Sequence, residues 1–310
     1  VYAIDGSIVE IPNTKLTREE FEIPEKTELM KDTSTARISC MADTKWDFII
    51  SSNITNKSTS EIEHALMHLD DVKNKIDLTK TITTYDRFYN SIEIMFKTML
   101  LDSYFIIRGK THTFKKQQNK MKKEGKTDET HEINIKKAQI NNFFTEEVKK
   151  FARKTREIKV RIVFVKLKTG ETETLFTNLP KEIATPEELK ELYGTRWTIE
   201  KNYDRLKNKL HIEKFTGKKK IIIEQDFYSH IYLLNMLISL KHDADEEITR
   251  KPKETTKYKY VYKSNVNTLI GNIKEEMPRL LTDDKEEIKQ IVEEILDIAR
   301  KDLVLSLIHI

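Results

Sequence analysis

Residues 193–207 read Tyr193-Gly-Thr-Arg-Trp-Thr-Ile-Glu-Lys-Asn-Tyr-Asp-Arg-Leu-Lys207. Four of them carry the side chains of interest: Tyr193, Arg196, Glu200 and Lys207. The intervals of two, three and six intervening residues place all four within an arc of roughly 60° on an α-helix, at about 100° per residue. The shared face is either a strip that contacts phosphates, with one acid in its middle, or an exposed helix surface stabilised by ion pairs.

Two aspartates stand near the predicted ends of strands. Asp5 lies in or at the end of the first predicted strand, and Asp86 ends a β-rich segment that begins at Thr79. If these strands are neighbours, the two carboxylates come together, and Glu200 can complete a cluster. Carboxylates without a histidine partner favour hard divalent cations such as Mg²⁺ or Mn²⁺. Each aspartate alone is also typical of a turn or a helix cap.

Such a cluster predicts phosphodiester chemistry. Two divalent ions about 4 Å apart would activate a water or a 3′-hydroxyl and stabilise the leaving oxygen of an in-line attack. On the predicted helix, Arg196 lies one turn before Glu200 and Lys207 lies two turns after it, so both would hold flanking phosphates.

The composition excludes several classes of protein. The chain has 310 residues, of which 34% are charged and 38% hydrophobic, so we expect one large domain or two smaller ones. No run of eighteen apolar residues is present, which predicts no membrane span. The start at Val1, inside a predicted strand and without a signal peptide, indicates that an N-terminal part of the natural protein is missing.

The single cysteine and the basic clusters bear on location and partners. Cys40 excludes an internal disulfide and fits a reducing cytoplasm, and its apolar surroundings predict a buried structural thiol. Between Arg108 and Lys126 there are eight basic residues and one acid, and Lys218-Lys-Lys220 forms a second cluster. Basic runs of this kind are either solvated loops or sites for a polyanion.

Hydrophobic periodicity predicts an α/β layer around a mixed sheet in residues 1–110. The predicted elements are a strand in 1–12 with a turn at Asp5-Gly6, a loop over 13–35, a hairpin over 36–55, a helix from Ser60 to Val72, a strand at 79–85, a helix at 91–101 and a strand at 103–107.

The remaining segments are predicted as follows. Residues 111–183 form a lysine-rich, partly β insertion with a hairpin at 158–177. Residues 184–245 hold a helix that begins at Pro186, breaks near Gly194 and resumes through Lys209, and then a helix at 225–240. Residues 246–310 hold a charged linker around 249–259, helices near 264–276 and 285–303, and an apolar tail without an assigned function.

The pattern Y-x-x-R-x-x-x-E-x-x-x-x-x-x-K resembles the YREK signature of bacterial DDE transposases of the insertion-sequence-four family. Other blocks agree in order: Ala3-Ile-Asp-Gly-Ser7, Asp86-Arg-Phe-Tyr89, Phe105-Ile-Ile-Arg-Gly-Lys110, Phe215-Thr-Gly217 and Gln225-Asp-Phe-Tyr228. The likeness covers nearly all of residues 2–270. The motif after Asp86 departs from the family, in which Arg-Gly is common where this chain has Arg-Phe.

The resemblance implies a ribonuclease H-like α/β fold, a mixed sheet flanked by helices, with the insertion between the second and third acids. It implies Asp5, Asp86 and Glu200 as catalytic and metal-binding residues, with Mg²⁺ or Mn²⁺ as two ions. It implies Tyr193, Arg196 and Lys207 as DNA contacts. Such enzymes cut transposon ends and join them to target double-stranded DNA as homodimers in a synaptic complex, here on the cytoplasmic nucleoid of a prokaryote.

Four further residues are candidates for DNA contact. Arg87, Arg108 and Lys110 could reach phosphates, although surface ion pairing explains the arginines equally. Trp197 either stacks on a base or packs in the core. Three functions follow from these observations: a transposase, a non-catalytic DNA-binding regulator derived from one, or a plain metal-dependent endonuclease.

Overall fold

The computed structural model describes residues 1–24, 33–167, 169–250 and 260–307. The chain divides into two compact units. The first consists of Val1–Tyr203 with Phe215–Glu224, and the second of Asp204–Lys214 with Gln225–Ile310. Asp5, Asp86 and Glu200 all belong to the first unit.

The first unit is built on a mixed sheet that has eight strands within the described residues, in the order β3-β2-β1-β4-β5-β8-β7-β6. The pairs β1–β4 and β4–β5 are parallel and the others antiparallel. The strands are β1 (Tyr2–Ile11), β2 (Ser34–Asp43), β3 (Ile49–Asn56), β4 (Ile82–Tyr85), β5 (Tyr104–Arg108), β6 (Asp128–Asn134), β7 (Glu157–Lys166) and β8 (Thr172–Thr177).

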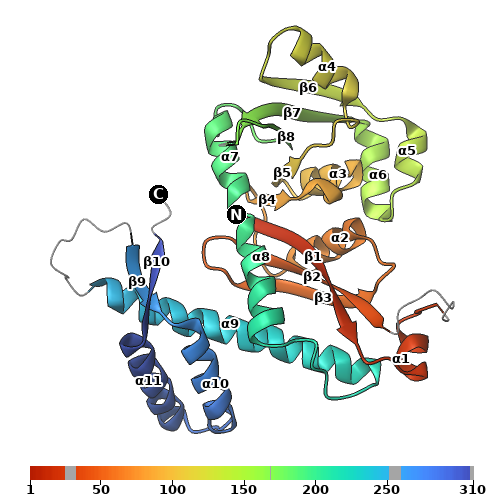
Figure 1. Cartoon of the computed structure of the whole chain (residues 1–310). Coiled ribbons are helices and arrows are strands. Elements are labelled where there is room, and N and C mark those ends of the chain that lie inside the picture. Colours follow the sequence, from red (N-terminus) through yellow and green to blue (C-terminus); the bar gives the residue numbers. More distant parts are fainter. Residues whose placement is uncertain (25–32, 168, 251–259, 308–310) are drawn as a thin grey trace. The chain divides into compact units, whose positions relative to one another are not determined.

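Helices flank both faces of this sheet (Figure 1). The helical elements within Val1–Tyr203 are α1 (Lys15–Glu20), α2 (Glu61–Val72), the 3-10 turn η1 (Arg87–Tyr89), α3 (Ile92–Leu100), α4 (Lys115–Lys123), α5 (Lys137–Asn141), α6 (Glu146–Thr155), α7 (Pro186–Gly194) and most of α8 (Trp197–Asp204). Because side chains alternate along a strand, Ile107 of β5 packs with α2, α3 and α6, whereas Ile106 packs with α7.

The second unit is mainly helical. It contains the π-helical turn η2 (Arg205–Lys209), most of α9 (Lys220–Arg250), β9 (Tyr260–Ser264), α10 (Val266–Leu280), α11 (Lys285–Lys301) and β10 (Leu303–Leu307). β9 and β10 pair antiparallel, so part of the apolar tail is a strand. The Asp245 carboxylate accepts hydrogen bonds of 2.8 Å from the backbone N–H and the hydroxyl of Ser264. These bonds fix the start of the β9–α10 connection to α9.

Most of the predicted elements are confirmed. The hairpin is β2–β3, and α2 and α7 each begin with a capping box, Ser60 with Glu63 and Thr185 with Glu188. The break after Gly194 is also present, because α7 ends there and α8 begins at Trp197. No helix in the described part of the chain is long and apolar enough to span a membrane.

Other expectations were wrong or incomplete. The predicted turn at Asp5-Gly6 does not exist, because β1 continues through both residues, which pair with Cys40 and Ser39 of β2. Ladder pairing outweighs the local turn preference here. Strand β6 was missed in the lysine-rich segment, and the helix predicted at 225–240 lies within the longer α9. Residues 251–259 of the predicted linker lie outside the described residues.

A buried arginine connects the sheet with the start of α7. Arg161 is only 2% exposed, and its guanidinium donates to the Asp128 carboxylate at 2.9 and 2.8 Å. It also donates to the carbonyls of Pro180 at 3.3 Å and Ala184 at 2.7 Å. Because a buried charge is costly without partners, these bonds stabilise one position for the loop that leads into α7.

His68 is a buried histidine of α2 that lies against β2 and β3. His68 Nδ1 lies 2.8 Å from the Ser51 hydroxyl, and Nε2 lies 2.9 Å from the Ser39 hydroxyl, which donates to the Asp5 carbonyl at 3.0 Å. Burial lowers the pKa of His68 to about 3 and that of the nearby His64 to about 4. Both histidines are therefore neutral at physiological pH.

These lowered pKa values predict acid sensitivity of the first unit. Below about pH 6.5 the unfolded chain binds protons that folded His68 does not, so the free energy of unfolding falls by about 1.4 kcal/mol per pH unit for that group. Urea unfolding followed by tryptophan fluorescence reports on this unit, because Trp46 and Trp197 both lie in it. Between pH 7.5 and 5.0, His68→Gln should lose about 2 kcal/mol less stability than wild type does.

The exposed His112 supplies the control, since His112→Gln should keep the wild-type dependence on pH. Equal losses in the His68 and His112 variants would contradict the assignment of a buried neutral His68.

Candidate active site

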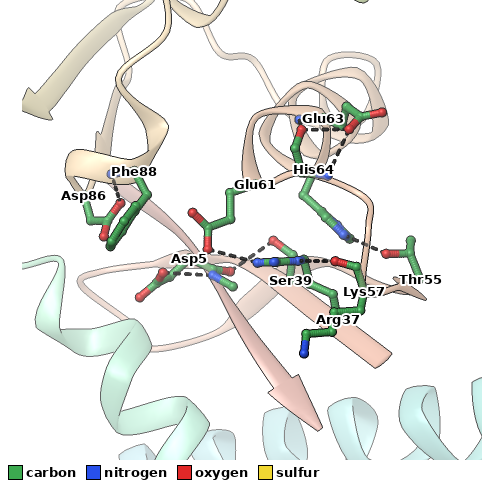
Figure 2. Close-up of polar contacts among 12 residues, drawn as sticks. Asp5, Arg37, Ser39, Thr55, Lys57, Glu61, Glu63, His64, Asp86 and Phe88 are labelled. Atoms are coloured by element: carbon green, nitrogen blue, oxygen red, sulfur yellow. Dashed lines mark hydrogen bonds and ion pairs between the residues drawn. The ribbon is translucent and has the colours of Figure 1, made fainter. Parts of the chain in front are cut away.

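Asp5 and Asp86 lie directly beyond the last pair of the parallel ladder between β1 and β4. That pair is Ile4–Tyr85; Asp5 is the next residue of β1, which continues to Ile11, and Asp86 follows the last residue of β4. Because the two strands run in the same direction, the residues after this pair lie side by side, and the register brings the two acids together. Figure 2 shows the carboxylates of Asp5 and Asp86 near Glu61, the first residue of α2.

The Asp5 backbone is held firmly. Its carbonyl accepts hydrogen bonds from the Ser39 hydroxyl at 3.0 Å and from the Tyr203 hydroxyl of α8 at 2.6 Å. Its side-chain Oδ1 accepts from the Gly6 N–H at 2.8 Å. Opposite Asp5 on β2 is Cys40, a buried free thiol as predicted, whose pKa burial raises to about 12.

The Asp5 carboxyl has a pKa raised to about 6. Burial is the main cause, and the negative charges of Asp86 and Glu200 raise the pKa further. The Gly6 hydrogen bond and the Arg196 charge act in the opposite direction. Three mutually repelling carboxylates therefore share one neighbourhood, which is typical of sites that bind a cation or a proton.

Asp86 is fixed by the turn that follows it. Its Oδ1 accepts from the Phe88 N–H at 2.6 Å and so caps η1. The turn is anchored by Tyr89, which is fully buried and packs its ring 5.7 Å from that of Tyr85. The carboxylate thus has a defined position at the end of β4.

Glu200 lies on α8, and polar contacts attach this helix to the sheet. Asn202 donates to the carbonyl of Asp47 at 2.7 Å, and Thr198 donates to that of Thr44 at 3.4 Å, both in the β2–β3 turn. Together with the hydrogen bond from the Tyr203 hydroxyl to the Asp5 carbonyl, these contacts fix the distance of α8 from the sheet and its rotation about the helix axis. The Glu200 side chain remains partly exposed, at 33%.

Arg196 bridges two of the three acids. Its Nη1 lies 3.3 Å from Asp5 Oδ2 and its Nη2 lies 2.6 Å from Glu200 Oε1. The residue is 8% exposed, and its buried Nε has no hydrogen-bond partner among the described residues. The guanidinium thus supplies part of the positive charge that the carboxylates require.

The side chains of Asp5, Asp86 and Glu200 are suitable ligands for a hard divalent cation, because all three offer carboxylate oxygens and their negative charges repel one another. Within the described residues, however, no three His, Cys, Asp or Glu side chains are arranged so that they could hold an ion together. Since Arg196 contacts both Asp5 and Glu200, an ion between these two would have to replace the guanidinium.

The predicted strip from Tyr193 to Lys207 is not one α-helical face. Tyr193 lies in α7, Arg196 lies between the helices, Glu200 lies in α8, and Lys207 lies in the π-helical turn of the second unit. Tyr193 is 8% exposed, packs against the α7 face of the sheet, and has its ring 5.8 Å from the Arg196 guanidinium. Burial raises its pKa to about 12. Trp197 is 60% exposed, which excludes the alternative of core packing.

The other predicted DNA contacts gather beside Asp86. Arg87, Arg108, Lys110 and His112 line a surface depression of about 370 Å³ together with Glu173 and Thr174. Arg108 pairs with Glu173 at 2.6 Å, so the ion-pair alternative holds for this arginine. Gly109 permits the close approach of β8, because a Cβ there would lie 2.8 Å from the Phe176 ring.

Sequence reasoning missed Glu61 and Tyr89. Glu61, the first residue of α2, accepts from Arg37 at 3.0 Å (Figure 2). A Cβ on Gly6 would lie 3.7 Å from Glu61 Cγ and 3.5 Å from the Tyr89 hydroxyl, which is buried without a partner in the described structure. The sequence assigned neither of them a role, because Glu61 is typical of any first helical turn and Tyr89 counted only as part of the block that begins at Asp86.

The fold and the site define an α/β domain in which Asp5 of β1, Asp86 after β4 and Glu200 of α8 share one neighbourhood. The family model described as the transposase DDE domain matches residues 1–236. The chain therefore belongs to the transposase DDE domain family. No curated protein matches it.

The chain is also similar to a solved structure, the cryo-EM structure of a piggyBac transposase synaptic complex with hairpin DNA. The TM-score is 0.51 and the sequence identity 10%, and the match covers 95% of this chain and 57% of that chain. The likeness agrees with the predicted ribonuclease H-like fold class.

Removal of the buried charge of Asp5 should stabilise the first unit. At pH 7.5 folded Asp5 is ionised despite a pKa near 6, so Asp5→Asn should raise the free energy of unfolding by about 1–3 kcal/mol. The gain should shrink below pH 6, because wild-type Asp5 then binds a proton in the folded state. Urea unfolding at pH 7.5 and 5.0 measures both effects.

Asp102 is a suitable control, because it is exposed and has a φ of 49° that asparagine tolerates. Asp102→Asn should change stability little at either pH. A loss of stability in Asp5→Asn at pH 7.5 would show that the Asp5 charge is well compensated in the fold.

Proposed function

We propose that the first unit is the catalytic domain of a transposase of the insertion-sequence-four family, which cleaves the ends of its element and joins them to target DNA. The observation that carries this proposal is the register of β1 and β4. It brings Asp5 and Asp86 side by side, and the contacts of Arg196 link Glu200 to Asp5. The family match and the transposase neighbour support the same class of function.

In the proposed reaction, a water oxygen attacks a phosphorus at the element's end. The bond from phosphorus to the 3′-oxygen breaks, and this oxygen takes a proton to become a 3′-hydroxyl. The hydroxyl oxygen then attacks a phosphorus of the target strand and displaces another 3′-oxygen, so the number of phosphodiester bonds is conserved in the second step.

Asp5, Asp86 and Glu200 would hold the divalent cations, Mg²⁺ or Mn²⁺, and we propose two. When bound, such ions lower the pKa of a water or hydroxyl and neutralise charge on the leaving oxygen. The chain's own residues supply the positions: the hydroxyls of Ser39 and Tyr203 hold the Asp5 backbone, and the Phe88 N–H orients Asp86.

Positively charged and aromatic side chains would hold the DNA. Arg196, once released from the acids, and Lys207 are proposed to contact phosphates, and Tyr193 to support Arg196 through its ring. Arg87 and Lys110, and Arg108 once released from its ion pair with Glu173, would extend the phosphate contacts beyond Asp86, and the exposed Trp197 would stack on a base. The partner is double-stranded DNA, and we propose a homodimer in the synaptic complex.

A non-catalytic DNA-binding regulator is the second candidate. The bridge from Arg196 to Asp5 and Glu200 favours it, because a guanidinium that stays in place would neutralise the acids without an ion. Such a protein would bind the ends but neither cut nor join them.

Glu200→Gln tests the proposed chemistry. The variant keeps the size of the side chain but removes its charge, so strand cleavage of the element's end DNA in Mg²⁺ should fall at least about 1,000-fold, while end binding changes less than about threefold. Gel assays of labelled strands measure cleavage, and fluorescence anisotropy measures binding.

The exposed Glu191 of α7 provides the matched control, and Glu191→Gln should cleave at the wild-type rate. Cleavage by Glu200→Gln at the wild-type rate would disprove the role of Glu200. A pre-cut 3′-hydroxyl end with target plasmid separates the remaining functions: a transposase forms joined product, an endonuclease only nicks the plasmid, and a regulator does neither.

A further inference from the structure

A line of buried hydrogen bonds connects α2 with the backbone of Asp5. The His68 ring lies between the hydroxyl of Ser39 on β2, 2.9 Å from Nε2, and the hydroxyl of Ser51 on β3, 2.8 Å from Nδ1. Ser39 in turn contacts the Asp5 carbonyl at 3.0 Å (Figure 2). His68 and Ser39 are fully buried, and Ser51 is nearly so. Because buried polar groups need partners, these contacts show where each proton along the line lies.

The contact with Asp5 places a proton on Nε2 of His68. A carbonyl oxygen only accepts hydrogen bonds, so the single proton of the Ser39 hydroxyl points to the Asp5 carbonyl. The Ser39 oxygen can then only accept from His68, and Nε2 has to be the donor. A ring without a proton on Nε2 would draw the Ser39 proton away from Asp5.

The opposite side of the ring gives the same assignment. The side-chain nitrogen of Asn53 lies 3.3 Å from Nδ1, and an amide N–H only donates, so Nδ1 is the acceptor. Ser51 can also donate to Asp71 at 2.7 Å, but this carboxylate is partly exposed and pairs with Lys75 as well. With the pKa of His68 lowered to about 3, the ring carries one proton, and both sets of contacts place it on Nε2.

The Asp5 carbonyl belongs to the peptide unit that holds the Asp5 carboxylate. Its oxygen accepts from Ser39 and, at 2.6 Å, from Tyr203. The nitrogen of the same unit is that of Gly6, whose N–H donates to Asp5 Oδ1 at 2.8 Å. A peptide unit is planar, so hydroxyl groups that hold its oxygen also determine the direction of its N–H. His68 is thus linked to the carboxylate through Ser39 and this peptide plane, without touching it.

We propose that His68 is a positioning residue of the active site. As the Nε2–H tautomer it keeps the Ser39 proton on the Asp5 carbonyl, and the Asp5–Gly6 peptide then holds the carboxylate in the direction in which it would bind a cation. The proposal rests on the proposed function, because it needs Asp5 as a ligand. Removal of a group behind a metal ligand commonly lowers metal affinity or activity by roughly 10- to 100-fold.

Nitrogen NMR measures the tautomer in the unaltered protein. Long-range ¹H–¹⁵N spectra of protein with ¹⁵N-labelled histidine, recorded at pH 7.5, show which ring nitrogen carries the proton. The chain has eight histidines, and the signals that disappear in His68→Gln belong to His68. The spectrum should show a protonated Nε2 and a bare Nδ1. A protonated Nδ1 would overturn the proposal.

Replacements of His68 separate positioning from packing. His68→Leu removes the donor to Ser39 but keeps a bulky side chain, so Mn²⁺ affinity and the rate of cleavage should each fall about 10-fold. His68→Gln should stay within about threefold of wild type, because the glutamine amide N–H can donate in place of Nε2–H. EPR of free Mn²⁺ measures the affinity, counted only for the binding that Asp5→Asn abolishes.

His64 provides the matched control. It lies one turn before His68 on α2, is equally buried, and has its Nε2 2.9 Å from the hydroxyl of Thr55 on β3. His64→Leu should keep Mn²⁺ affinity and cleavage within about threefold of wild type. Ser39→Ala should lower both as His68→Leu does. His68→Leu added to Ser39→Ala should cause no further loss, because His68 acts through Ser39.

The outcomes separate this proposal from the proposed function. Wild-type Mn²⁺ affinity and cleavage in His68→Leu, or equal losses in His64→Leu, would overturn the positioning role and leave the transposase proposal intact. Losses that add in the double variant would also overturn it, since His68 would then act independently of Ser39. If Asp5→Asn changes neither Mn²⁺ binding nor cleavage, both proposals fail. The tautomer and Ser39→Ala decide the matter where His68→Leu does not fold.

Discussion

The parallel pairing of β1 with β4 is the constraint on which the site depends. A shift of this register by one residue would move Asp5 to the opposite face of the sheet relative to Asp86. The antiparallel ladder with β2 secures the register on the other side of β1, where Asp5 pairs with Cys40. Two hydroxyl groups on the Asp5 carbonyl then leave its carboxylate as the part of the residue available for chemistry.

This placement has an electrostatic cost, which the structure offsets locally. Burial raises the pKa of Asp5, and the negative charges of Asp86 and Glu200 raise it further. Arg196 lowers the cost by contacting Asp5 and Glu200 at once. The same guanidinium is a proposed phosphate contact, so the loading of cations and the release of Arg196 toward DNA would be coupled steps.

Much of this could be predicted from the sequence, for identifiable reasons. The alternation of apolar and polar residues predicted the β2–β3 hairpin, and Ser60 and Thr185 indicated where α2 and α7 begin. Asp5 and Asp86 stood out because each carboxylate follows a strand-like run, although β1 continues past Asp5. The single helical strip from Tyr193 to Lys207 was wrong, because the predicted break near Gly194 separates Tyr193 from Glu200 and because Lys207 lies in a π-helical turn that no local pattern indicated. The ion pair of Glu61 with Arg37 joins residues 24 positions apart and left no local pattern.

We propose that Asp5, Asp86 and Glu200 form one cation site, and that Arg196 neutralises part of its negative charge before ions bind. A crystal structure after Mn²⁺ soaking, with anomalous scattering recorded, measures this most directly. Anomalous peaks are expected between the three carboxylates, with the Arg196 guanidinium turned away from Asp5 and Glu200. Saturating Mn²⁺ without a peak there, and with Arg196 still bridging the two acids, would contradict it.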